Sequence, residues 1–195
     1  MNEDSIKSAL EKGFQLHMGI AEQGKLYALE NNHQLALLYY RTAINMTVSA
    51  KDPEIFFRHY LECSLESMEH LGMLEEVLNY CDQALELYKN NPPPNEFARM
   101  DFVYIHQKKA VILMKLGKKK EAIEFFNKAL ELAKQEKAKL PLTLTLLRWL
   151  RGGYFIEAAR ITAEQYKEAY FNVQKDTVDP SKAIKLPDED LLPVQ

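Results

Sequence analysis

A spacing of small and aromatic residues recurs along this chain and limits what it can fold into. The spacing is Gly-x4-Ala/Val-x3-aromatic-x2-Ala, and its best copy consists of Gly117, Ala122, Phe126 and Ala129. A single unit of this size cannot bury its own apolar face, so several units must stack to form a core. The chain is therefore expected to be an array of similar small units.

Three weaker copies of the spacing lie elsewhere in the chain. They are Asn31, Ala36, Tyr40 and Ala43, then Gly72, Val77, Cys81 and Ala84, and finally Gly153 and Ala158. The equivalent positions 36, 77, 122 and 158 are 41, 45 and 36 residues apart. Their small and aromatic members are expected to be the packing joints between helices.

Composition and charge are those of an ordinary globular protein. With 195 residues, 47% apolar and 27% charged, the chain can bury a core in one domain without metal or disulfide. The net charge of -3 gives no overall attraction to nucleic acid or anionic membrane. Residues 1–105 carry 8 Lys/Arg against 16 Asp/Glu, and residues 106–139 carry 10 against 4. The array is thus expected to have an acidic start and a basic middle.

Cysteine usage and the N-terminus favour a cytoplasmic protein. Only Cys63 and Cys81 are present, both in apolar-periodic segments, which argues against a disulfide framework. Cys81 is expected to be a packing residue and Cys63 the more exposed thiol. The first residues are acidic where a signal peptide would be basic, and no stretch approaches the ~20 apolar residues of a membrane span.

Apolar residues recur with a period of 3.6, and alternation with a period of 2 is absent, so the fold class is all-α. The expected helices cover residues 5–30, 34–50, 53–71, 74–89, 95–116, 119–137, 141–152 and 155–173. Asp52 is expected to cap the third of these and Pro53 to be its first residue. Gly72 is expected to end it in the left-handed conformation. The helical domain spans residues 1–173, and residues 174–195 form an irregular tail.

These helical pairs resemble tetratricopeptide repeats. The family's packing places are filled in the first and third repeats by Gly24, Tyr27, Ala36, Tyr40, Ala43, Ala110, Leu113, Gly117, Ala122, Phe126 and Ala129. The resemblance covers about residues 6–173 and implies a right-handed α-solenoid, a superhelix of about four antiparallel helix pairs. Because a standard repeat has about 34 residues, the longer intervals indicate a long-helix variant.

The resemblance implies that the first helix of each repeat lines a concave groove that binds a peptide or protein segment. The candidate groove residues are Lys25, Leu29, His59, Glu62, Cys63, Glu66, Glu69, His70, Tyr104, Gln107, Lys108, Val111, Met114, Lys115, Leu147, Leu150 and Arg151. Tyr104, Met114 and Leu147 are expected to anchor the peptide. Glu66, Lys108 and Arg151 are expected to set its direction by charge. Glu66 stands where the carboxylate-clamp members have Asn, so that clamp is expected to be absent.

One stripe of candidate groove residues has an alternative interpretation. His59, Cys63, Glu66 and His70 lie at i, i+4, i+7 and i+11 on one helical face, and all four are metal-ligand types. The alternative is a polar groove wall, which is favoured because one helix supplies at most two ligands to an ion. No metal site is therefore predicted. The lysines at positions 115 and 118–120 are expected to be solvated, and nucleic-acid binding is not expected.

No phosphate-cradling loop, nucleophile elbow or zinc-protease motif is present. The function expected is a non-enzymatic scaffold or adaptor that binds a protein or peptide, with no cofactor and no membrane. The alternatives are a secretion-type chaperone or ligand-responsive sensor and, less favoured, a metal-dependent enzyme. A homodimer is compatible with the sequence. The tail motif LPDEDLLPVQ could occupy the basic third-repeat groove of its own or a neighbouring chain, or be solvated.

Overall fold

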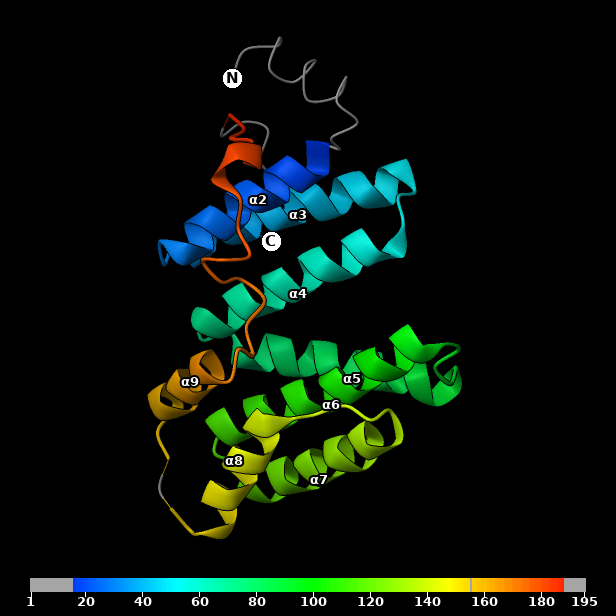
Figure 1. The fold of residues 1–195 in the computed structure, drawn as a ribbon, viewed down its shortest axis with the longest axis vertical. Helices are drawn as coiled ribbons and strands as arrows, with labels where there is room; N and C mark the ends of the chain where they lie inside the picture. Colours follow the sequence, from blue (N-terminus) through cyan, green and yellow to red (C-terminus); the bar gives the residue numbers. More distant parts are fainter. Residues whose placement is uncertain (1–15, 155, 188–195) are drawn as a thin grey trace. The chain divides into compact units, whose positions relative to one another are not determined.

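The computed structural model describes residues 16–154 and 156–187, and these residues form α-helices and no strand (Figure 1). The helices are α2 (Leu16–Leu29), α3 (His33–Ala50), α4 (Glu54–His70), α5 (Leu74–Asn90), α6 (Glu96–Lys115), α7 (Lys119–Gln135), α8 (Pro141–Arg151) and α9 (Ala158–Lys167). The prediction of an all-α, solenoid-like fold is confirmed. The part of the expected first helix before residue 16 lies outside the described residues.

The chain divides into two compact units. Unit 1 consists of residues 1–72 and 171–195, and unit 2 consists of residues 73–170. The boundary falls between α4 and α5, so the two helices of the expected second pair belong to different units. The chain thus leaves unit 1 after Gly72 and returns to it at Phe171.

In unit 1, α3 packs against both α2 and α4. Its core contains Ile20, Tyr39, Ala43 and Tyr60, all at most 2% exposed. Helices α2 and α3 approach closely at Gly24, where an added Cβ would lie 2.8 Å from a ring carbon of Tyr40. A residue without a side chain is therefore required for this helix contact.

In unit 2, α6 is the central helix and packs against α5, α7 and α9. Helix α8 packs against α7 and α9. The best copy of the recurring spacing lies in this unit, and Ala122, Phe126 and Ala129 are fully buried. The packing role predicted for these three residues is confirmed.

The other copies of the spacing have mixed outcomes. Ala36, Tyr40 and Val77 are fully buried, as predicted. The prediction for Ala158 is wrong, because α9 begins at this residue and its side chain is exposed. The residues that α9 buries are Ile161 and Gln165, one and two turns further along the helix. The fourth unit therefore does not keep the register of the other three.

Several helix boundaries depart from prediction. Pro53 is the N-cap of α4 and Glu54 its first residue, whereas Asp52 pairs with a histidine described below. Gly72 has φ +75° with no atom near its Cβ position, which confirms the left-handed helix end. Helix α9 ends at Lys167, shorter than the expected 155–173, and Ala169 follows with φ +50°.

The C-terminal residues return to unit 1 as an irregular segment. Beyond the 3-10 turn η1 (Pro180–Lys182), described residues 171–187 hold no helix. They are nevertheless packed, because Ile184 belongs to the core with Ile20 and Val173 to the core with Cys63. Figure 1 draws this segment in orange to red, with its 3-10 turn at α2. We call residues 171–187 the strap. The tail motif lies largely beyond residue 187, outside the described residues.

Candidate functional site

Helix α6 carries six of the candidate groove residues on one face. Their spacing of i, i+3, i+4, i+7, i+10 and i+11 places them together, and they are Tyr104, Gln107, Lys108, Val111, Met114 and Lys115. Val111 and Met114 are buried at 0% and 4% exposure. Tyr104 is 48% exposed. Gln107 and Lys108 are also buried, at 6% and 7% exposure, so Tyr104 is the one exposed residue among these six.

The polar residues on this face of α6 contact other parts of unit 2. The side-chain amide of Gln107 donates to the hydroxyl of Thr143 in α8 at 2.9 Å. The Lys115 ammonium donates to the hydroxyl of Thr162 in α9 at 2.8 Å. The Lys108 ammonium lies 5.6 Å from the ring centroid of Tyr170, a cation–π contact. Helices α8 and α9 and Tyr170 thus contact the polar residues of the face that was predicted to line the groove.

The three candidates in α8 also serve the fold of unit 2. Leu147 and Leu150 are buried at 3% and 8% exposure. The Arg151 side chain is exposed, and its guanidinium donates to the side-chain oxygen of Asn127 in α7 at 3.0 Å. Trp149 is partly buried beneath the guanidinium of Arg160, which lies 4.6 Å from its ring. Of the groove residues in unit 2, Tyr104 and Arg151 are exposed.

In unit 1, Glu66 of α4 binds the strap. One oxygen of its carboxylate accepts hydrogen bonds from the backbone N–H of Asn172 at 2.8 Å and of Val173 at 3.3 Å. The side chain is only 5% exposed, so these charge-assisted bonds lie away from bulk water. This residue was expected to orient a bound peptide by charge, and it holds a segment of the chain itself.

His70, at the end of α4, stacks against a second histidine. Its ring is 4.3 Å from that of His33 with 13° between planes, and 4.7 Å from the ring of Phe171. The Nδ1 atom of His33 lies 3.3 Å from the hydroxyl of Ser67. Burial, and after it the neighbouring His70, lower the pKa of His33 to about 4. His33 is therefore neutral at physiological pH while its ring stacks on that of His70.

The remaining candidates of unit 1 include a buried thiol, Cys63. Cys63 is fully buried and burial raises its pKa, so the expectation of an exposed thiol is wrong. The ring of His59 lies 4.0 Å from the Cys63 sulfur, and burial together with the charge of Lys25 lowers the His59 pKa. Lys25 itself pairs with Glu22 at 3.0 Å. Leu29 and Glu62 are partly buried and Glu69 is buried.

The stripe of His59, Cys63, Glu66 and His70 does not converge on one point. Glu66 and His70 contact the strap, and Cys63 is in the apolar core with Val173. Within residues 16–154 and 156–187, no group of three or more His, Cys, Asp or Glu side chains is placed to hold a metal ion.

A second buried polar cluster was not foreseen from the sequence. The Nδ1 atom of His17 lies 2.7 Å from the Tyr60 hydroxyl, and its Nε2 atom lies 3.2 Å from the Asp52 carboxylate. Burial lowers the pKa of His17, although Asp52 acts in the opposite direction. Asp52 was predicted to be a helix cap. In the structure it pairs with His17 and so joins α2 to the start of α4.

Comparisons with known proteins identify the central helix pair of unit 2. Residues 103–136 match the family model of the tetratricopeptide repeat. No curated protein and no solved structure matches the chain. The matched residues 103–136 span most of α6, all of α7 and the turn at Gly117. Among the helices of the described residues, none has the length and apolar character that crossing a membrane requires. The segment formed by most of α6 and all of α7 is therefore similar to a tetratricopeptide repeat.

Proposed function

We propose that the chain is a non-enzymatic interaction module that binds a protein or peptide segment on the first half of α6. The tetratricopeptide repeat supports an interaction role, since repeats of this family act as protein-binding scaffolds. The observation that carries the proposal is the exposure of Tyr104, at 48%, on the face that the family uses for binding. A partly exposed Tyr offers a large apolar ring and a hydroxyl at low entropic cost.

A second aromatic residue extends this surface. Phe97 is 53% exposed and precedes Tyr104 by seven residues, so both lie on one side of α6. Met100, partly buried, lies between them along the helix. We call Phe97, Met100 and Tyr104 the α6 stripe. It offers apolar anchors at the spacing that suits a helical or extended peptide.

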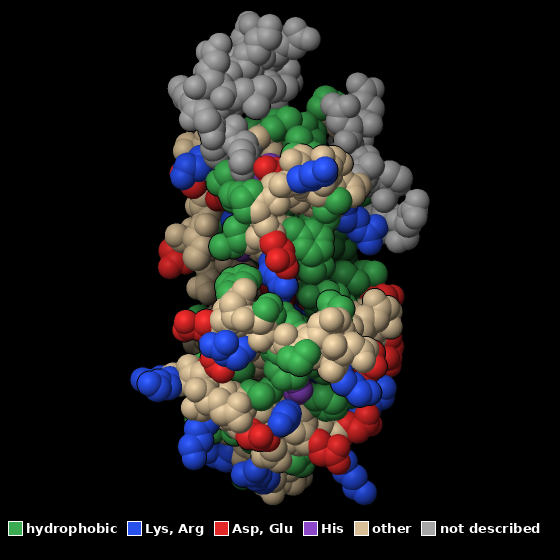
Figure 2. Space-filling model, turned by 90° about the vertical axis from the view of Figure 1, so that its right-hand side faces the viewer, with side chains coloured by type: hydrophobic (Ala, Val, Ile, Leu, Met, Phe, Trp, Pro, Cys, Tyr) green, Lys and Arg blue, Asp and Glu red, His purple; other side chains and the backbone are tan. Residues whose placement is uncertain are grey.

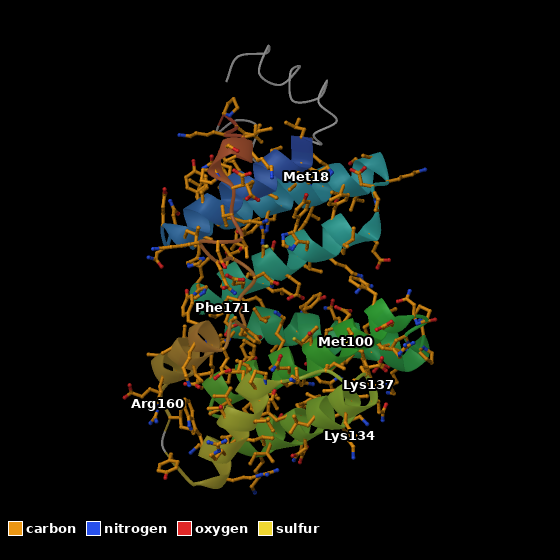
Figure 3. All side chains as sticks on the ribbon, in the orientation of Figure 1. Met18, Met100, Lys134, Lys137, Arg160 and Phe171 are labelled. Atoms are coloured by element: carbon orange, nitrogen blue, oxygen red, sulfur yellow. The ribbon has the colours of Figure 1, made fainter. Side chains whose placement is uncertain are left out.

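Two exposed lysines near the α6 stripe, Lys134 and Lys137, could pair with carboxylates of an acidic partner. Arg99 forms two hydrogen bonds to Glu136, at 2.9 and 3.0 Å, which brings the start of α6 beside the end of α7. Lys134 and Lys137 flank Glu136 in sequence, and Figure 3 shows both at the same end of the hairpin as Met100. The space-filling view shows Lys and Arg side chains standing out from unit 2 (Figure 2). Such charges increase the association rate with an acidic segment.

The proposal is tested by selecting peptides from a random displayed library on the full chain and measuring their affinities for variants. Tyr104→Ser should weaken the selected peptides at least about tenfold, the effect of losing one buried anchor. Tyr166→Ser is the matched control, because Tyr166 is 54% exposed on α9 and should leave binding unchanged. Equal affinity for wild type and Tyr104→Ser, with helical content retained, would refute the site.

A further inference from the structure

The strap is bound to unit 1 almost as a separate peptide would be. Near its start, the N–H groups of residues 172 and 173 donate to Glu66, as described above. Further along, the N–H of Asp179 donates to the carboxylate of Glu22 in α2. The N–H of Ile184 then donates to the backbone oxygen of Gly19 at 2.9 Å. Each of these bonds uses a backbone N–H group of the strap as the donor. An extended segment of another protein also has backbone N–H groups.

Two pairs of apolar side chains fix the ends of the strap. Phe171 and Val173 are buried at 3% and 5% exposure, the first against His70 and the second in the Cys63 cluster. Ile184 is buried at 7% exposure. The backbone N–H of Leu186 donates a hydrogen bond to the hydroxyl of Tyr39 at 3.2 Å. Most residues between these ends are exposed. The pattern is an apolar-x-apolar pair at each end of an extended segment.

The receiving surface is shaped for close backbone approach. At Gly19, in the first turn of α2, an added Cβ would lie 2.5 Å from the Ile184 side chain and 2.8 Å from the Lys182 backbone oxygen. Helix propensity alone would favour Ala over Gly at this position. The glycine therefore serves the docking of the strap and not the helix. We call Gly19, Glu22, Tyr39, Glu66 and His70 the strap face.

We propose that the strap face is a second peptide-binding site, whose ligand is an extended, net-positive segment of a partner protein, and that residues 171–187 are its intramolecular occupant. The strap carries Lys175, Lys182 and Lys185 against two aspartates, and it lies against two carboxylates of the strap face. A partner segment with the same end pairs and positive charge would make the same bonds. The α6 stripe belongs to the other unit and favours an acidic ligand, so the two binding activities can be lost separately.

The experiment uses a fluorescent synthetic peptide with the sequence of residues 171–187, titrated with the full chain and followed by anisotropy. Wild type should bind weakly, because its own strap competes at high effective concentration. Val173→Asp in the protein weakens the attached strap and should tighten peptide binding at least about tenfold. Ile184→Asp does the same from the opposite end, and a peptide of scrambled sequence is the control.

The receiving side is tested by adding Gly19→Ala to either variant. Its Cβ occupies the place of the ligand, so peptide affinity should fall at least about tenfold while α2 keeps its helical structure. In the wild-type chain, saturating peptide should displace the strap and speed hydrogen exchange at the Ile184 amide.

Three results would overturn the proposal. The first is exchange at Ile184 that peptide leaves unchanged in wild type. The second is binding of the native peptide no tighter than the scrambled one, or binding that Gly19→Ala does not alter. The third is light scattering that shows a dimer of the wild-type chain which dissociates when the peptide binds, because the natural occupant would then be the strap of a second copy.

Discussion

The low pKa of His33 predicts that acid destabilises unit 1. The unfolded chain takes up a proton on this imidazole near pH 6.5, whereas the folded chain keeps it neutral until about pH 4. Protons therefore bind the unfolded state preferentially in this range, and stability falls as the pH falls from about 7 to 4. Below about pH 4 both states are protonated and the loss levels off.

The size of the effect follows from the two pKa values. For 6.5 unfolded and about 4 folded, linkage gives a loss of about 2 kcal/mol at pH 5 and at most about 3 kcal/mol below pH 4. His33 is the first residue of α3, where the positive end of the helix dipole also opposes an imidazolium. His33→Gln keeps a hydrogen-bonding side chain beside Ser67 and removes the titration.

The assay is urea unfolding followed by far-UV circular dichroism at about pH 7.5 and about pH 5. Wild type should lose about 2 kcal/mol more than His33→Gln between these two conditions. Trp149 is the single tryptophan and lies in unit 2, so its fluorescence serves as an internal reference. Parallel pH dependence of the wild type and the variant would refute the reasoning, whatever their absolute stabilities.

Four further substitutions test the packing and one turn. Gly24→Ala places a Cβ 2.8 Å from the buried Tyr40 ring, so overpacking of about 1 to 3 kcal/mol should exceed the helix gain of about 1 kcal/mol and lower the urea midpoint. An unchanged or higher midpoint would contradict the close helix contact. Phe126→Ala should cost about 3 to 5 kcal/mol by Trp149 fluorescence, whereas the exposed Phe97→Ala should stay within about 0.5 kcal/mol. Similar losses in both would mean that Phe126 is not a central packing residue. Gly117→Ala forces a side chain to φ +76° and should cost about 1 to 2 kcal/mol in thermal unfolding. No shift in the unfolding temperature would show that this turn does not depend on glycine.

Helix positions and packing joints could be predicted from the sequence because both depend on local patterns. The burial of Ala36 and Ala122 follows from their repeated spacing on the inner side of a helix. Ala158 fits the same spacing and is exposed, because burial also depends on where α9 begins. Helix α9 was expected to reach residue 173, but Phe171 and Val173 are strap anchors in the structure. Periodicity alone does not distinguish such anchors from the last turn of a helix.

The candidate site was harder to predict than the fold, because an open face and a covered face have the same local sequence. The spacing identified Glu66 and Lys108 as residues of one face of their helices. It did not reveal that the Glu66 carboxylate accepts a hydrogen bond from the backbone N–H of Asn172, 106 residues later in the chain. Nor did it reveal that Lys108 lies beside Tyr170. The apolar pairs at residues 171 and 173 and at 184 and 186 were visible signals within a stretch that was expected to be a tail.

The return of the strap to unit 1 has a consequence for synthesis. On the ribosome, the strap face is made early, and residues 73–170 must be translated before its occupant appears. At the usual rate of roughly 5 to 20 residues per second, that interval lasts about 5 to 20 s. During this time the backbone of Gly19 and the carboxylate of Glu66 are open to the extended segments of other nascent chains. A competing ligand would thus meet no intramolecular competitor during translation. It would have to compete with the strap once the protein is complete.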